Sequence, residues 1–163
     1  MRRRHVLSVP ALAALLATGP LAGTAMAAAP VELTGGAQVT DFVITGVTRT
    51  GGDVDRFTVT SVNKLTGDVQ GVTISDLTCI GDLEDLVAFT CRGTSTFTGT
   101  YDGQQFESFS RTSFRCSFVT DVCKGVTVTY ASTGALAGTR SSGTFEQGAT
   151  SGAGTYTLRV VGL

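Results

Sequence analysis

The sequence predicts an all-β protein built as one antiparallel barrel of eight strands, and three observations lead to this prediction. From about residue 37 onward, apolar and polar residues alternate in short runs rich in threonine, valine and phenylalanine, which is typical of half-buried strands. Glycine-rich turn signals separate these runs at roughly regular spacing. This part of the chain shows no long apolar pattern at the helical period, so no crossover helix is available to join parallel strands.

The strand-like runs follow one another from residue 39 to residue 160. Gly51-Gly52-Asp53 and Gly67-Asp68 mark turns, and Asp102-Gly103 is a hairpin signal because this pair tolerates the positive φ of tight turns. Residues 80–86 are expected to form one helical turn at most. The expected strands cover residues 39–45, 56–60, 69–75, 87–91, 95–101, 114–118, 126–130, 143–146 and 155–160.

A sheet with this many strands is expected to close on itself. Closure removes the unpaired strand edges, so we favour a barrel, with a two-sheet β-sandwich as the alternative. No linker or change of composition divides residues 37–163, which we interpret as one barrel domain. Residues 28–36 are interpreted as a short N-terminal extension.

The first 27 residues have the pattern of a secretory signal peptide. Basic residues 2–4 precede an apolar run from Val6 to Leu16, and small residues end the segment at 25–27. We therefore expect a secreted, extracellular protein that uses the general secretory route. The pair Arg3-Arg4 keeps twin-arginine export open as an alternative.

Loss of this leader changes which functions are available. The net charge would move from −1 to about −4, because residues 2–4 are all arginine. No basic stripe for nucleic acid remains, and no apolar stretch reaches the roughly 20 residues of a membrane span. The only histidine, His5, would also be removed, which excludes Ser-His-Asp and Cys-His chemistry and histidine-bound zinc.

Four cysteines lie beyond the leader, and an even number in an exported chain favours two disulfides. Four cysteines allow three pairings. We favour Cys79–Cys91 and Cys116–Cys123, because each pair closes a short connection between two strand-like runs. The cysteine intervals lack the close pairs of a zinc site, and the acidic clusters lack the spacing of a helical calcium loop. We expect neither a metal nor a cofactor.

Three stretches resemble a known family. Residues 66–71 (TGDVQG) are similar to a TGDLxG turn, and residues 97–103 (FTGTYDG) resemble an FTGTxxG hairpin. Residues 134–145 (GALAGTRSSGTF) and 154–158 (GTYTL) resemble the ending of small bacterial domain-of-unknown-function proteins with an allene-oxide-cyclase-like barrel. Dirigent proteins share a comparable glycine-rich stretch. The resemblance covers about residues 37–160 and implies a dirigent-like or calycin-like antiparallel barrel of eight strands with a central cavity.

The resemblance implies a fold and no particular reaction. Ser141 stands where the family pattern has glycine, and the four cysteines are an addition to that pattern. No catalytic residue of allene oxide cyclase can be matched to a position in this chain, so none is carried over.

The aromatic residues are expected to face one interior. An eight-stranded barrel is either filled by side chains or holds one small ligand, and both interpretations stay open. If a cavity exists, the ligand-binding candidates are Tyr101, Phe106, Arg115 and Tyr130. The aromatic set consists of Phe89, Phe97, Tyr101, Phe106, Phe109, Phe114, Phe118, Tyr130, Phe145 and Tyr156.

Three functional hypotheses fit these observations. The first is a secreted barrel that binds a small apolar or amphipathic molecule, or that serves as a non-catalytic extracellular module. The second is a cyclase-like or dirigent-like enzyme that guides a reactive intermediate inside the barrel. The third is a surface module for protein interactions. Because no histidine remains after loss of the leader, we favour the first hypothesis over an enzyme.

Overall fold

The computed structural model of the chain describes residues 29–49, 54–85 and 87–163. The expected signal peptide and the expected turn at residues 51–53 lie outside the described residues. The described part contains one short 3-10 helix, η1, at Gly134–Leu136. Its strands are β1 Val31–Arg49, β2 Asp55–Gly67, β3 Val69–Gly81, β4 Ala88–Tyr101, β5 Gln104–Ser117, β6 Val122–Ser132, β7 Arg140–Gln147 and β8 Ala153–Val161.

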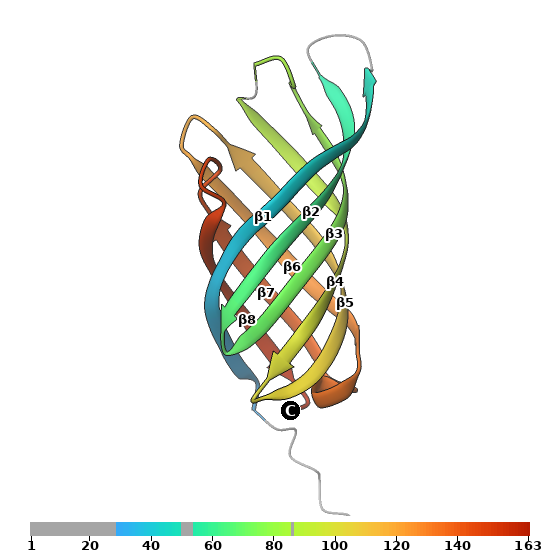
Figure 1. Cartoon of the computed structure of the whole chain (residues 1–163), viewed down its shortest axis with the longest axis vertical. Helices are drawn as coiled ribbons and strands as arrows, with labels where there is room; N and C mark the ends of the chain where they lie inside the picture. The colour runs from blue at the N-terminus through green and yellow to red at the C-terminus, as the bar shows by residue number, and fades with distance from the viewer. Residues whose placement is uncertain (1–28, 50–53, 86) are drawn as a thin grey trace, which may run out of the picture.

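The eight strands form one antiparallel sheet that closes into a barrel in chain order (Figure 1). Strand β1 pairs with β2 along one side and with β8 along the other, so every strand has two neighbours. The prediction of an all-β antiparallel fold is confirmed. The sandwich alternative is wrong, because pairing of β1 with β8 leaves the described sheet without a free edge.

The strands are longer than the alternating runs indicated. Strand β1 begins at Val31, so most of the range interpreted as an N-terminal extension is strand and pairs with β8. The runs at 87–91 and 95–101 are parts of the single strand β4. Arg92, Gly93 and Thr94 join them without a break, because residues with weak apolar character still pair when neighbours lie on both sides.

The two ends of the barrel differ in their connections. At the lower end of Figure 1 lie the tight turns β2–β3 and β4–β5, helix η1 and the C-terminus. At the upper end lie the β3–β4, β5–β6 and β7–β8 connections, which are longer excursions between strands. We call the lower end the floor and the upper end the mouth.

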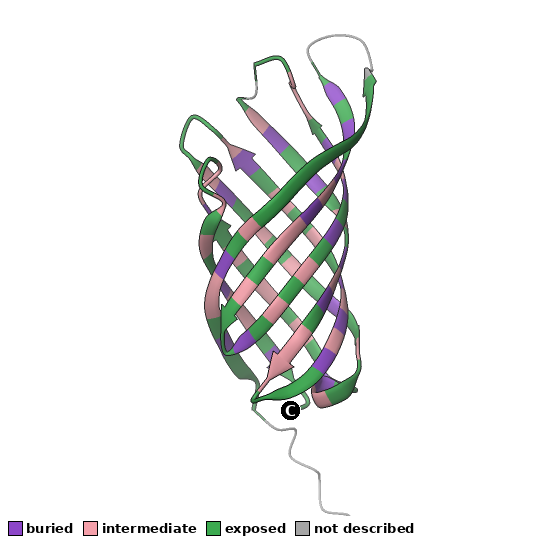
Figure 2. Ribbon diagram, in the orientation of Figure 1, coloured by how far each residue is buried: buried purple, intermediate pink, exposed green. Residues whose placement is uncertain are grey.

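Burial alternates along the strands, as Figure 2 shows by bands of different colour. The inward side chains form two apolar clusters, one at each end. The floor cluster consists of Leu33, Ala37, Val69, Phe97, Phe106, Leu136, Tyr156 and Val160. The mouth cluster consists of Phe57, Val59, Leu77, Cys79, Phe89, Cys91, Cys116 and Cys123.

Helix η1 and two facing glycines complete the floor. Leu136 of η1 is 6% exposed and packs into the floor cluster. Gly71 and Gly99 are partners in the β3–β4 ladder, and a Cβ atom on either one would lie within 3 Å of the Phe97 ring. The two glycines therefore leave the space that this ring needs, and the centroid of Phe97 lies 4.8 Å from that of Phe106.

Both expected disulfides are present. Cys79–Cys91 joins directly opposed residues of β3 and β4, and Cys116–Cys123 does the same for β5 and β6. All four cysteines point into the barrel and belong to the mouth cluster. The pairing predicted from the spacing is confirmed, and the covalent links hold neighbouring strands together at the open end of the barrel.

Candidate functional site

A cavity of about 520 Å³ lies inside the barrel, above the floor cluster. Residues from the β3–β4, β5–β6 and β7–β8 connections also line it, including Leu83, Phe118 and Ala149. Phe118 is 38% exposed and Phe42, another lining residue, is 40% exposed. Since these lining side chains reach solvent, the cavity opens at the mouth.

Aromatic rings form the upper wall of the cavity around Phe89. The Phe89 centroid lies 5.9–6.2 Å from the centroids of Phe42, Phe57, Phe114 and Phe118. These rings come from strands β1, β2, β4 and β5 and from the residue after β5, so the cluster spans about half of the ring of strands. Tilted and edge-on ring pairs at these distances are favourable contacts, which indicates a preformed apolar wall.

A row of hydroxyl groups runs around the middle of the cavity wall from β3 to β6. Ser75 Oγ and Ser95 Oγ are 2.8 Å apart, and Ser95 Oγ and Thr112 Oγ1 are also 2.8 Å apart. Thr112 Oγ1 and Thr127 Oγ1 follow at 3.4 Å. We call Ser75, Ser95, Thr112 and Thr127 the hydroxyl row; all four line the cavity.

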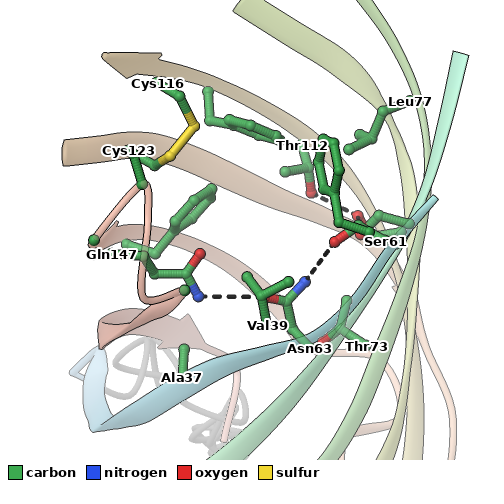
Figure 3. Close-up of a pocket in the computed structure, with 18 of the residues that line it drawn as sticks. Ala37, Val39, Ser61, Asn63, Thr73, Leu77, Thr112, Cys116, Cys123 and Gln147 are labelled. Carbon is green, nitrogen blue, oxygen red and sulfur yellow. Dashed lines mark hydrogen bonds between the residues drawn. A yellow bond between two sulfur atoms is a disulfide. The ribbon is translucent and has the colours of Figure 1, made fainter. Parts of the chain in front are cut away.

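Two amide side chains meet on the other side of the cavity (Figure 3). Gln147 Nε2 of β7 donates a hydrogen bond of 3.2 Å to Asn63 Oδ1 of β2, and Asn63 Nδ2 donates to Ser61 Oγ. Ala37 and Val39 of β1, the strand that pairs with β2, also line the cavity (Figure 3). The amide oxygen of Gln147 points into the open space in Figure 3.

Tyr156 of β8 lines the bottom of the cavity and ties it to the floor. Its hydroxyl accepts from the Val69 backbone N–H at 3.1 Å and donates toward the carbonyls of Thr66 and Val69. Burial raises the pKa of Tyr156 above its ordinary value, so this hydroxyl stays protonated around neutral pH. Because the hydroxyl is held by the backbone of the β2–β3 turn, Tyr156 braces that turn.

Beside the mouth, Asp121 joins two of the connections. Asp121 Oδ1 accepts a hydrogen bond of 2.7 Å from the Thr150 backbone N–H, and its carbonyl accepts from Ala149. The hydrogen bonds from Thr150 hold the pKa of Asp121 below its ordinary value. The carboxylate therefore fastens the β5–β6 turn to the β7–β8 connection.

The described lining of the cavity contains no Asp, Glu, Lys or Arg side chain. Lys124 and Glu146 form an ion pair of 3.1 Å on the outer face, where both side chains are more than half exposed. Within the described ranges, no group of three or more His, Cys, Asp or Glu residues is placed to hold a metal ion. The chemistry that the cavity offers is therefore that of hydroxyls, amides and apolar surface.

Comparison with protein-family models finds no match for this chain, and comparison with curated proteins finds none either.

The four ligand-binding candidates lie away from the cavity. Phe106 is buried in the floor cluster and Tyr101 packs against it, so both lie below the cavity. Arg115 and Tyr130 are exposed on the outer face, and Tyr130 is 59% exposed. Neither lines the cavity, because β5 and β6 turn Cys116 and Cys123 inward and the even-odd alternation then places Arg115 and Tyr130 outside.

The polar residues that line the cavity were not among the ligand-binding candidates predicted from the sequence. The alternation Phe57-x-Val59-x-Ser61-x-Asn63-x-Leu65 on β2 is the signal that could have found Asn63, since all five residues point the same way. Phe42 and Phe57 were also left out of the expected aromatic set, although both line the cavity. Gln147 carries no such signal, because its meeting with Asn63 depends on closure of the barrel.

None of the helices in the described ranges is long and apolar enough to cross a membrane.

Proposed function

We propose that this protein is a secreted β-barrel that binds one small apolar or amphipathic molecule inside its cavity. The observation that carries the proposal is the cavity of about 520 Å³, which falls within the usual size range of small-molecule sites. Its walls combine aromatic rings with a few hydrogen-bonding side chains, which is the usual composition of such sites. The ligand would enter at the mouth, beside the exposed rings of Phe42 and Phe118.

Binding is better supported than catalysis by the same residues. A cyclase-like or dirigent-like reaction needs a group that transfers a proton or stabilises charge. Tyr156 is the one side chain in the described lining that titrates, and its hydroxyl is engaged with the backbone around Val69. The described cavity wall is uncharged, and its one titratable group, the Tyr156 hydroxyl, is already hydrogen-bonded to the backbone. This arrangement favours a carrier or a receptor over an enzyme.

Export and family membership belong to the same proposal. Two disulfides support an oxidising compartment outside the cytoplasm, because cytosolic thiols are kept reduced. The ring of eight antiparallel strands and the matching order of the three sequence stretches support an allene-oxide-cyclase-like family.

The test uses two neighbouring positions on β3. Thr73 lines the cavity, whereas Ile74 points outward and is 51% exposed. In the oxidised protein, Thr73→Trp should narrow the cavity and weaken binding of N-phenyl-1-naphthylamine, an uncharged fluorescent probe. Ile74→Trp, the control, should bind the probe as the unaltered protein does. Because the chain has no tryptophan, each variant also reports the polarity around its new ring by fluorescence.

Two results would contradict cavity binding. One is absence of probe binding by the unaltered protein. The other is an unchanged probe affinity in a folded Thr73→Trp variant, which would place the probe elsewhere on the surface.

A further inference from the structure

In the middle of the barrel, polar side chains face the interior and apolar side chains face solvent, which reverses the usual arrangement. On β3, Ser75 faces the cavity while Ile74 beside it is 51% exposed. On β6, Thr127 faces the cavity while Val126 and Val128 are 51% and 53% exposed. If the face of β6 that carries Val126 and Val128 pointed inward, apolar surface would be removed from water and the fold would be more stable. A barrel that served stability alone would use that face, so the inward hydroxyls indicate another role.

The hydrogen bonds in the cavity wall are incomplete in a way that suits a ligand. The four hydroxyls of the hydroxyl row carry four hydrogens, and the three contacts between them use three. One hydroxyl hydrogen is therefore left to donate. On the opposite side, Gln147 donates to Asn63 through Nε2, which leaves its oxygen to accept a hydrogen bond. The wall thus offers both a donor and an acceptor.

The cavity has no charge to match an ion. Its described lining contains no ionised side chain, and the cations of β5 and β6, Arg111, Arg115 and Lys124, are exposed on the outer face. A carboxylate or an ammonium group moved into this cavity would lose its hydration without gaining an opposite charge. An uncharged polar group loses much less, because the hydroxyl row and Gln147 can replace its bonds to water.

We propose that the ligand is an uncharged amphipathic molecule whose hydroxyl, carbonyl or amide group binds between the hydroxyl row and the Asn63–Gln147 bridge. Its apolar part lies among the rings around Phe89, toward the mouth. The cavity discriminates by charge: it accepts neutral lipid-like or terpenoid-like molecules and rejects their acidic and basic counterparts. This inference rests on the proposed function and adds the chemical class of the ligand.

The experiment compares ligands that differ at one end. Displacement of N-phenyl-1-naphthylamine from the oxidised protein at neutral pH is measured with n-decanol, methyl decanoate, decanoate, decylammonium and n-decane. We expect decanol and methyl decanoate to bind at least about tenfold more tightly than decanoate and decylammonium. Decane should bind more weakly than decanol, because it leaves the polar wall without a partner.

Variants on β6 test whether charge in the cavity sets this preference. Thr127→Lys places a cation in the cavity wall and should move the preference toward decanoate by about tenfold or more. Val128→Lys adds the same charge on the outer face and should leave the preference unchanged. As a second measurement that keeps the shape of the wall, Thr112→Val should weaken decanol by about twofold to tenfold and leave decane unchanged.

The outcomes separate this inference from the proposed function. Equal affinity for decanol and decanoate would overturn the inference while leaving cavity binding intact. A Thr112→Val variant that weakens decanol and decane equally would also overturn it. Failure of the unaltered protein to bind the probe or any of the five molecules would overturn both.

Discussion

The floor and the mouth of the barrel interior are held together in different ways. At the floor, tight turns bring the strands close, and the rings of Phe97, Phe106 and Tyr156 with Leu136 of η1 fill the space. At the mouth, longer connections leave the interior hollow, and the disulfides Cys79–Cys91 and Cys116–Cys123 link neighbouring strands.

This difference shows how one sheet can be both stable and hollow. A filled end gains its stability from packing, and that gain is lost where a cavity replaces side chains. Covalent links stabilise by restricting the unfolded chain, so they need no filled interior around them. The disulfides therefore add covalent links to the mouth cluster, at the end of the barrel where the cavity opens.

The sharpest test removes one ring from each end. Phe97→Ala in the filled floor should lower the free energy of unfolding by about 3–5 kcal/mol, because it leaves a void among buried neighbours. Phe114→Ala beside the cavity should lower it by clearly less, since Phe114 is only partly buried, but should weaken probe binding more. Urea unfolding of both variants, with probe titration, measures the two effects. Equal losses of stability would show that the two ends are not different.

The next largest loss of stability is expected from removing a disulfide at the mouth. Replacing Cys79 and Cys91 together by alanine should lower the free energy of unfolding by about 2–3 kcal/mol, as expected for closing a short loop. Hydrogen exchange should quicken at the mouth ends of β3 and β4, while the amide of Val69 at the floor stays protected. Faster exchange at both ends to the same extent would contradict a separate role for the disulfides.

The sequence was informative about strands and disulfides because both depend on local patterns. Alternation marked the strands, and the short spacing of the cysteines predicted which pairs meet. Alternation shows that a strand has two faces, but not which face is inside. On β6 the inward position of Cys123 sets Thr127 inside and Tyr130 outside, against the ranking of these residues by hydrophobicity.

The motifs that carry the family resemblance contribute to the floor and supply only part of the cavity lining, namely Thr144, Phe145, Tyr156 and Leu158. Gly67, with φ at +103°, lets the chain turn where Asp68 accepts a hydrogen bond from the Thr34 backbone N–H. Gly99 leaves room for the ring of Phe97, and Leu136 closes the end of the barrel. Asn63, Gln147 and the hydroxyl row lie outside these motifs and are brought together by closure of the sheet. Alternation along one strand can indicate such a residue, as it does for Asn63, but not which residues it meets.

Tyr156→Phe tests how the floor is fastened to the β2–β3 turn. The ring is kept, so packing changes little, but the buried Val69 N–H loses its acceptor. We expect a loss of about 1–3 kcal/mol in the free energy of unfolding, together with faster hydrogen exchange at Val69. Unchanged stability would mean that the ring alone makes the contribution of Tyr156, and the floor would then rest on packing alone.

The smallest effect is expected from Asp121 at the mouth, because its carboxylate is exposed to solvent. The fold lowers its pKa below 3.8 through hydrogen bonds from Thr150, so the fold favours the ionised form. Its contribution to stability is present above that ordinary pKa and is lost as the pH falls through the lower value reached in the folded protein. Asn tolerates the positive φ of 50° found here, so Asp121→Asn should remove the charge and keep the turn.

The difference in unfolding free energy between the unaltered protein and Asp121→Asn should therefore be constant at neutral pH and shrink below about pH 4. Thermal unfolding of the two proteins across this pH range measures that difference. Parallel stability curves would mean that the ionised carboxylate does not help to fasten the connections, leaving the disulfides and the ring packing to hold the mouth.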